Sequence, residues 1–112
     1  MYQPSTLRPG IVNPAEWFQE RLEKEITKAQ NALQDGQVLD VIVILRDGSK
    51  LWPTWFGYWG PDMIRVEGTN EHGREVEVVM HYSAMEVVIG AADAPPGGGA
   101  KKRAIGFQAP EK

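Results

Sequence analysis

The stretch VLDVIVILRDGSKLWPTWFGYW, residues 38–59, decides the fold of this 112-residue chain. From Val38 to Leu45 nearly every position is apolar, which is typical of a strand that is covered on both faces. Asp47-Gly48 is a hairpin signal, and an aromatic strand follows it. Pro53 interrupts that strand and cannot donate a hydrogen bond to a neighbour. We therefore expect two adjacent strands, with a bulge or bend at Pro53 in the second.

A helix is predicted upstream, from Asn13 to about Asp35. Asn13 is a favoured N-cap residue, Pro14 suits the first helical position, and Glu16 stands where a capping box needs it. Apolar residues then recur at spacings of three and four, so they form one stripe that can cover the outer face of the first strand. The stripe consists of Ala15, Phe18, Leu22, Ile26, Ala29 and Leu33.

Three more short strands are predicted downstream, at 63–67, 74–80 and 85–89, because apolar and polar residues alternate there between turn signals. The fold class is therefore mostly β with an N-terminal α-helix. We expect a small, strongly bent, five-stranded antiparallel barrel, of the kind called Sm-like or SH3-like, in a domain spanning residues 13–90.

The two ends of the chain are expected to lie outside that domain. Residues 1–12 contain two prolines and a glycine and show no periodicity, so they predict a flexible arm. Residues 91–112 contain Pro-Pro, three successive glycines and a Lys-Lys-Arg cluster. This composition predicts a disordered tail, in which Ile105 and Phe107 could dock on a partner.

Composition excludes several classes of protein. The net charge is -3, which argues against a wholly basic nucleic-acid binder but leaves room for a local basic patch. Cysteine is absent, so disulfides and thiolate metal sites are excluded, and no metal or cofactor is expected. There is no signal peptide and no apolar run long enough to span a bilayer, so we expect a cytoplasmic protein without a membrane partner.

The order of elements and three local matches resemble the Sm-like family, and within it the bacterial Hfq-like proteins. The matches are Asn31-Ala32-Leu33 before the first strand, Val43 to Gly48 at the first turn, and His81 to Val88 near the end. The sequence departs from the family pattern at Pro53, where a glycine is usual, and at Tyr82, where a glycine or histidine is usual. Such departures fit a divergent, phage-borne member.

The resemblance implies a ring in which an edge strand of one subunit pairs with an edge strand of the next. A cyclic homo-oligomer of about five to seven copies would satisfy both edges. The alternative is a monomer whose edges are protected by charged residues such as Arg74 and Glu86. For the ring, the candidate interface residues are Val76, Val78, Met80, Met85, Val87 and Ile89.

The resemblance also implies single-stranded RNA binding by the loops that line the pore of the ring. Aromatic side chains can stack on unpaired bases, and cationic ones can meet phosphate. The candidate RNA-binding residues are Lys50, Tyr58, Trp59, Asp62, Met63, His81 and Tyr82. The remaining aromatic residues of the stretch, Trp52, Trp55 and Phe56, are expected to fill the barrel or a subunit interface.

A second function stays open from the sequence: a structural or protein-interaction ring that has lost the RNA site and holds a protein partner on the helix or tail. The acidic net charge favours this alternative. An enzyme is not expected. His72 and His81 are the only histidines, His72 lies in a hydrophilic turn, and no cysteine nucleophile is present.

Overall fold

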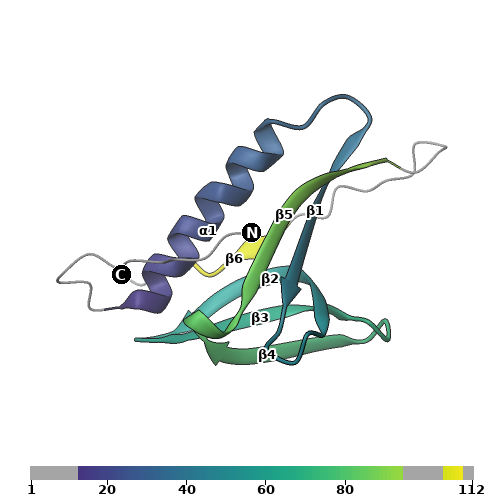
Figure 1. Cartoon of the computed structure of the whole chain (residues 1–112). Coiled ribbons are helices and arrows are strands. Elements are labelled where there is room, and N and C mark those ends of the chain that lie inside the picture. Colours follow the sequence, from purple (N-terminus) through teal and green to yellow (C-terminus); the bar gives the residue numbers. More distant parts are fainter. Residues whose placement is uncertain (1–12, 95–104, 110–112) are drawn as a thin grey trace.

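The computed structural model describes residues 13–94 and 105–109 (Figure 1). It confirms one N-terminal helix followed by a mainly antiparallel sheet, with six strands where five were predicted. The predicted arm, residues 1–12, lies outside the described residues. In chain order the elements are α1 (Pro14–Asn31), β1 (Gln37–Ile44), β2 (Lys50–Trp59), β3 (Met63–Asn70), β4 (Glu75–His81), the 3-10 turn η1 (Tyr82–Ala84), β5 (Glu86–Asp93) and β6 (Gly106–Phe107).

Helix α1 begins as its sequence predicts. The Asn13 side chain accepts a hydrogen bond from the backbone N–H of Glu16 at 3.0 Å, and Pro14 occupies the first turn. The helix ends at Asn31, four residues before the predicted end at Asp35. The chain needs residues 32–36 to reverse direction into β1, and Gly36 provides the positive φ of 81° in that turn.

The hairpin between β1 and β2 forms at the predicted Asp47-Gly48. Gly48 has a positive φ of 86°, and its N–H donates to the carbonyl of Leu45 at 2.9 Å. The Asp47 carboxylate accepts hydrogen bonds from the Ser49 hydroxyl at 2.6 Å and from the Ser49 N–H at 3.0 Å. These bonds, the hydroxyl first, lower the pKa of Asp47 below its ordinary value.

The sheet has the strand order β4-β3-β2-β1-β5, so the two predicted edge strands are indeed at its edges. Strand β1 pairs with β5 over its whole length but with β2 only at Val43–Leu51 and Ile44–Lys50. Strand β2 then turns away from β1 and follows β3, with a shift in register between Pro53 and Trp55. That shift confirms the predicted bulge. The sheet is bent but not closed, because β4 and β5 do not pair within the described residues.

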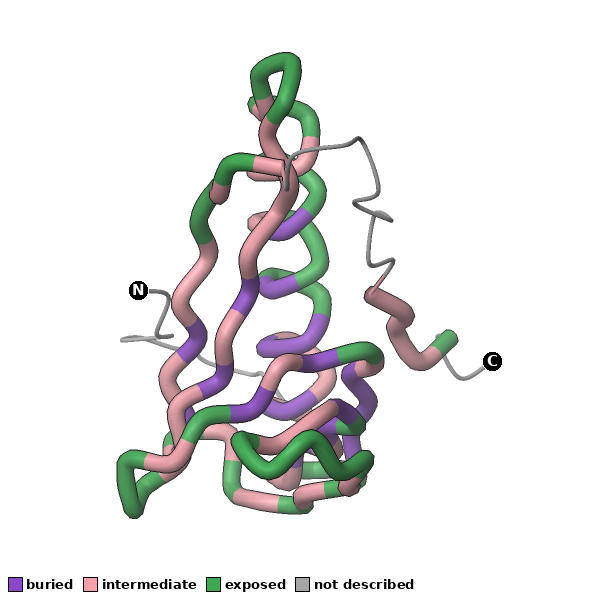
Figure 2. The backbone as a smooth tube through the Cα atoms, turned by 90° about the vertical axis from the view of Figure 1, so that its right-hand side faces the viewer, coloured by how far each residue is buried: buried purple, intermediate pink, exposed green. Residues whose placement is uncertain are grey.

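The bend produces two layers. The long β1–β5 ribbon runs beside α1, while β2, β3 and β4 form a sheet below them (Figure 1). Buried residues lie on the inward faces of these elements (Figure 2). Phe18, Leu22, Val43, Phe56 and Ile64 are among the side chains that fill the core. On β1, Val41 and Val43 face this core, whereas Ile42 and Ile44 on the other face are only half-buried. Within one chain, the predicted covering of both faces is therefore incomplete.

The prediction of a disordered tail from residue 91 is wrong for the parts that the structure describes. Strand β5 continues to Asp93, paired in register with Gln37 of β1. Strand β6 pairs in parallel with β2 at Trp55–Gly106 and Phe56–Phe107. The composition of residues 91–112 taken together does not predict these two short pieces, because they are ordered by pairing with β1 and β2, which are distant in the sequence. Residues 95–104 and 110–112 lie outside the described residues.

Phe18 is the largest side chain that α1 buries completely, and its ring lies 6.4 Å from that of Tyr82. We expect Phe18→Ala to lower the free energy of unfolding by about 3–5 kcal/mol, because it leaves a cavity where α1 meets the sheet. Chemical denaturation followed by circular dichroism measures the change. Glu20→Ala, on the exposed face of the same helix, is the control and should change stability by no more than about 0.5 kcal/mol. Equal effects of the two substitutions would contradict the packing described.

Candidate functional site

The outward face of β2, β3 and β4 carries an unusual group of side chains. Along β2, Phe56 and Tyr58 point into the core, so the residues that alternate with them point outwards. Two cross-strand rows follow from the register, one through Trp59, Met63 and His81, and one through Gly57, Arg65 and Val79. We call this group the outer patch; it consists of Trp55, Trp59, Met63, Arg65, Val79 and His81.

Arg65 is the centre of the outer patch. Its guanidinium carbon lies 5.2 Å from the ring centroid of Trp55 and 5.5 Å from that of Trp59, within the range of cation–π attraction. Its terminal nitrogen also lies 3.1 Å from a carboxylate oxygen of Glu77. The Nε atom is buried and has no hydrogen-bond partner among the described residues. The guanidinium therefore holds the two tryptophans in place and retains an unused donor.

Gly57 makes this arrangement possible. A Cβ atom at this position would overlap the ring of Trp55, which lies across the glycine. The Gln108 side-chain oxygen also lies close to this position, and Arg65 is paired with Gly57 across β2 and β3. In the pattern Trp-x-Gly-x-Trp, the glycine thus leaves room for the Trp55 ring, on which the Arg65 guanidinium rests.

The outer patch is accessible. Trp59 is 60% exposed and Val79 is 37% exposed, and these are the exposed large hydrophobic residues of the described chain. The same face becomes acidic further from Trp59, where exposed Glu67, Glu75 and Glu77 lie on β3 and β4. The site therefore offers flat apolar surface at one end and negative charge at the other.

A network of contacts connects the end of β4 to the start of β3. Its members are His81, Asp62 and Tyr82. The Nδ1 atom of His81 accepts from the Ser83 N–H at 3.2 Å, and its Nε2 lies 3.8 Å from a carboxylate oxygen of Asp62. The rings of His81 and Tyr82 stack with centroids 4.6 Å apart. Tyr82 donates its N–H to the carbonyl of Asp62 at 3.0 Å. This network positions the His81 ring at the rim of the outer patch.

The structure brings together five of the seven candidate RNA-binding residues at one end of β2, β3 and β4: Trp59, Asp62, Met63, His81 and Tyr82. Lys50 lies at the opposite end of the ten-residue strand β2, where its N–H donates to Glu71. Tyr58 is only 4% exposed and donates its hydroxyl hydrogen to Glu16 at 2.6 Å. Lys50, although exposed, and the buried Tyr58 therefore lie outside this group.

The six candidate interface residues lie on or next to the two edge strands, but their side chains face inwards. Met85 and Val87 are fully buried. Val76, Val78, Met80 and Ile89 are half-buried and pack against the core. A neighbouring subunit that paired with these edges would therefore meet backbone N–H and C=O groups rather than these side chains.

The sequence-based selection missed Trp55, Arg65 and Val79. Trp55 was expected to fill the barrel or an interface, yet it is half-buried on the outward face beside Arg65. The bulge between Pro53 and Trp55 decides which face the later residues of β2 use. The spacing of Trp55, Gly57 and Trp59 was the available signal, because residues two apart on a strand share a face.

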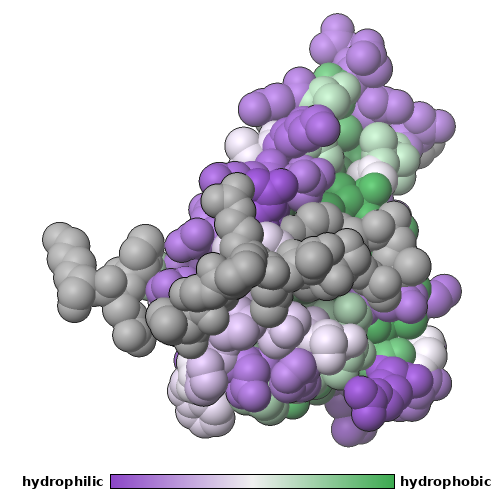
Figure 3. Space-filling view, turned by 60° about the vertical axis from the view of Figure 1, so that its left-hand side comes forward, coloured by the Kyte–Doolittle hydropathy of each residue, from purple (hydrophilic) through white to green (hydrophobic). Residues whose placement is uncertain are grey.

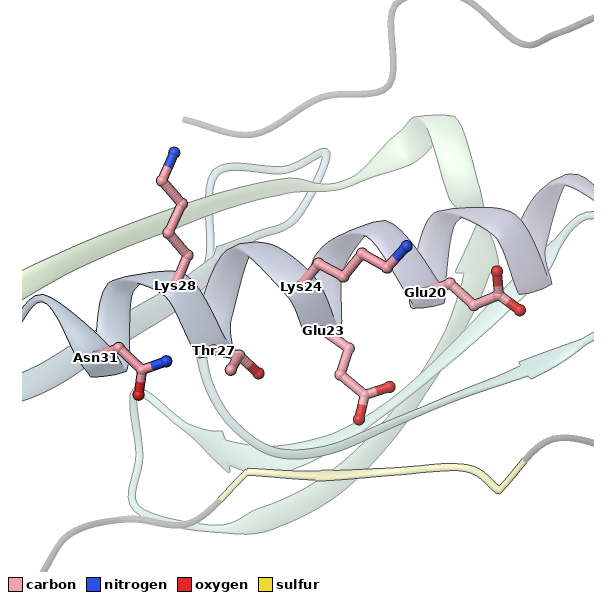
Figure 4. A pocket seen from close by; sticks show the side chains of 6 residues that line it. All are labelled: Glu20, Glu23, Lys24, Thr27, Lys28 and Asn31. Carbon is pink, nitrogen blue, oxygen red and sulfur yellow. The ribbon is translucent and has the colours of Figure 1, made fainter.

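Helix α1 carries a second candidate surface on its solvent side. A shallow hollow of about 670 Å³ there is lined, among the described residues, by α1 alone. Figure 4 shows its six side chains spreading from the helix: Glu20, Glu23, Lys24, Thr27, Lys28 and Asn31. Figure 3 shows hydrophilic residues dominating the upper part of one face, with hydrophobic ones gathered along one side. Mixed charges that do not converge on a point do not define a chemical site.

Within residues 13–94 and 105–109, no group of three or more His, Asp or Glu residues could hold a metal ion. The same part of the chain contains no helix with the length and hydropathy that crossing a bilayer requires. No protein-family model, curated protein or solved structure matches the chain.

Tyr58 has a structural role that can be measured. Tyr58→Phe removes its hydrogen bond to Glu16, so we expect a loss of about 0.5–1.5 kcal/mol in the free energy of unfolding. Urea denaturation measures this loss. Glu16→Gln, which keeps an acceptor oxygen, should cost less than Tyr58→Phe. A Tyr58→Phe variant as stable as the wild type would contradict this role.

Proposed function

We propose that this chain is a divergent Sm-like protein that assembles into a ring and binds single-stranded RNA through the outer patch. The observation that carries the proposal is the exposed indole of Trp59, supported by Arg65 and flanked by Met63 and His81. Flat aromatic surface held in place by a cation suits stacking with an unpaired base, which contributes about 1–3 kcal/mol per base.

The strand order supports assembly into a ring. Strands β4 and β5 end the sheet on its two sides, and each has one side unpaired within the described residues. Head-to-tail pairing of β4 with β5 of the next copy satisfies these backbone groups without any change of fold. The half-buried face of the β1–β5 ribbon, with Ile42 opposite Val88, provides apolar surface that a neighbour could cover.

The charges around the outer patch favour contact with bases over contact with phosphates. Arg65 is paired with Glu77, and Glu67 and Glu75 lie on the same face. Phosphates would be repelled by these carboxylates, whereas a stacked base needs no cation. RNA affinity should therefore fall less steeply with salt than it does for proteins that neutralise many phosphates.

A second function, a ring that binds a protein through the same patch, is favoured by a specific observation. Trp59 and Val79 are exposed together on a chain of net charge -3. Tryptophan is enriched among the residues that dominate protein interfaces, and the acidic surroundings disfavour RNA. Under this alternative the ring assembles, but the outer patch does not bind oligonucleotides at any salt concentration.

Light scattering coupled to size-exclusion chromatography tests the ring. We expect a mass of about five to seven times that of the 12.5 kDa chain. Val78→Pro, placed on edge strand β4, removes a backbone donor and should lower the assembly to monomers. Its matched control is Glu77→Ala, which leaves the backbone donors of the strand unchanged. A wild-type protein that elutes as a monomer at micromolar concentration rules out the ring.

Titration of fluorescent single-stranded oligonucleotides, oligo-U and oligo-A, tests RNA binding. Trp59→Ala should weaken binding about 5- to 150-fold, the equivalent of one stacked base. Glu77→Gln should strengthen it, because Arg65 loses its anionic partner. Tyr58→Phe is the control inside the core and should leave affinity unchanged. If the intact assembly shows no binding at low salt, RNA is excluded and the protein-binding ring remains.

A further inference from the structure

Residues 105–109 lie in a groove and are not an exposed loop. Beside the segment a hollow of about 270 Å³ remains, with apolar lining from Ile26, Leu39, Ile105 and Phe107, and the groove as a whole runs along one side of β2. It exists because β2 leaves β1 after Leu51, so that one side of β2 at Trp55 and Phe56 is free to pair with β6. Figure 1 shows β6 (yellow) between α1 and β2. The pairing is parallel and only two residues long, as when a short peptide is added to a sheet edge.

Backbone and amide groups of the groove hold the segment in one register. The Gln108 N–H donates to the carbonyl of Phe56 at 2.8 Å, and the Gln108 side-chain oxygen accepts from the Tyr58 N–H at 2.8 Å. The Gln19 side chain, 4% exposed, donates to the Gln108 carbonyl at 2.8 Å. Three partners from two elements thus converge on this one glutamine.

The flanking positions are equally selective. The Phe107 ring stacks on Phe56 with centroids 5.7 Å apart and an interplanar angle of 17°. A Cβ on Gly106 would lie 3.0 Å from the ring of Trp55, so a larger residue there requires the indole to move. Ile105 packs against the core and lines the hollow together with Ile26 of α1 and Leu39 of β1. The groove therefore selects the pattern aliphatic–Gly–Phe–Gln.

The bound segment leaves two polar groups of the groove available for further contacts. The side-chain oxygen of Gln19 is buried and has no donor among the described residues. Glu23 lines the groove beside Ile105, and Figure 4 shows its carboxylate on the side of α1 towards the yellow segment. A cation upstream of the aliphatic residue would complement this carboxylate, and in the sequence Lys101, Lys102 and Arg103 precede Ala104 and Ile105.

We propose that the groove between α1, β1 and β2 is a peptide-recognition site for an extended segment of another protein with the pattern basic–x–aliphatic–Gly–Phe–Gln, where x is any residue, and that residues 105–109 are its tethered competitor. The tether raises the local concentration of the built-in segment to the millimolar range, so a partner peptide must displace it. Peptide binding at this site requires neither the ring nor RNA, although Trp55 borders both the groove and the outer patch.

Fluorescence anisotropy with a labelled peptide of residues 103–110 tests the site. The full-length variant Phe107→Ala/Gln108→Ala weakens the tethered segment and should bind this peptide at least about tenfold more tightly than the wild-type chain does. The control peptides, with Phe107→Ala or Gly106→Ala, should bind at least about tenfold more weakly than the parent peptide. Equal binding of all three peptides, or no binding to a variant that melts cooperatively, overturns the proposal.

A second measurement covers the case in which the variant does not fold. A protease site is placed within residues 95–104 of the otherwise wild-type full chain, and the folded protein is cut there. The cut protein should retain its tryptophan emission, since Trp55 contacts Gly106, and should exchange its own segment for the labelled peptide. A cut protein that does not exchange shows residues 105–109 to be a fixed part of the core, and this overturns the proposal.

Discussion

The limited pairing between β1 and β2 is the constraint on which the rest of the structure depends. The two strands share only the pairs Val43–Leu51 and Ile44–Lys50 before the bulge between Pro53 and Trp55 redirects β2. Proline cannot supply the N–H that a regular ladder would need there. A single continuous sheet is thereby converted into a ribbon and a lower sheet, with α1 packed beside them.

Two different surfaces result from this redirection. Beyond the bulge, β2 presents Trp55, Gly57 and Trp59 outwards, where Arg65 joins the two indoles. Its free side accepts β6, and its inward residues Phe56 and Tyr58 anchor Phe107 and Gln108. Trp55 belongs to both surfaces, because it packs against Arg65 on one side and approaches Gly106 on the other. A ligand that moved this indole would therefore alter both surfaces.

The distribution of charge limits the chemistry available to these surfaces. Arg65 is already paired with Glu77, and Lys24 and Lys28 on α1 line their hollow together with Glu20 and Glu23. Recognition at the outer patch therefore depends on stacking and apolar contact, while the groove depends on backbone pairing and the amide of Gln19. Both modes read the shape and hydrogen bonding of a ligand, and neither needs the surplus of positive charge that nucleic-acid binders usually carry.

Local sequence determined the elements that depend on neighbouring residues. Asn13 and Pro14 start α1, Asp47-Gly48 makes the hairpin, and Pro53 breaks the ladder, because caps, turns and bulges are set by side chains within a few positions. The valine-rich strands β4 and β5 could likewise be assigned to the edges. The placing of Trp59, Met63 and His81 at one end also followed from strand order.

Only the tertiary structure decided what depends on long-range partners. Composition alone predicted disorder after residue 90, yet β1 orders the end of β5, and the free side of β2 orders residues 105–109. The bulge, not the residue type, decided that Tyr58 faces Glu16 in the core while Trp55 and Trp59 face Arg65 outside. A tryptophan or tyrosine suits a core and a binding surface equally well, so its role is set by the strand face it occupies.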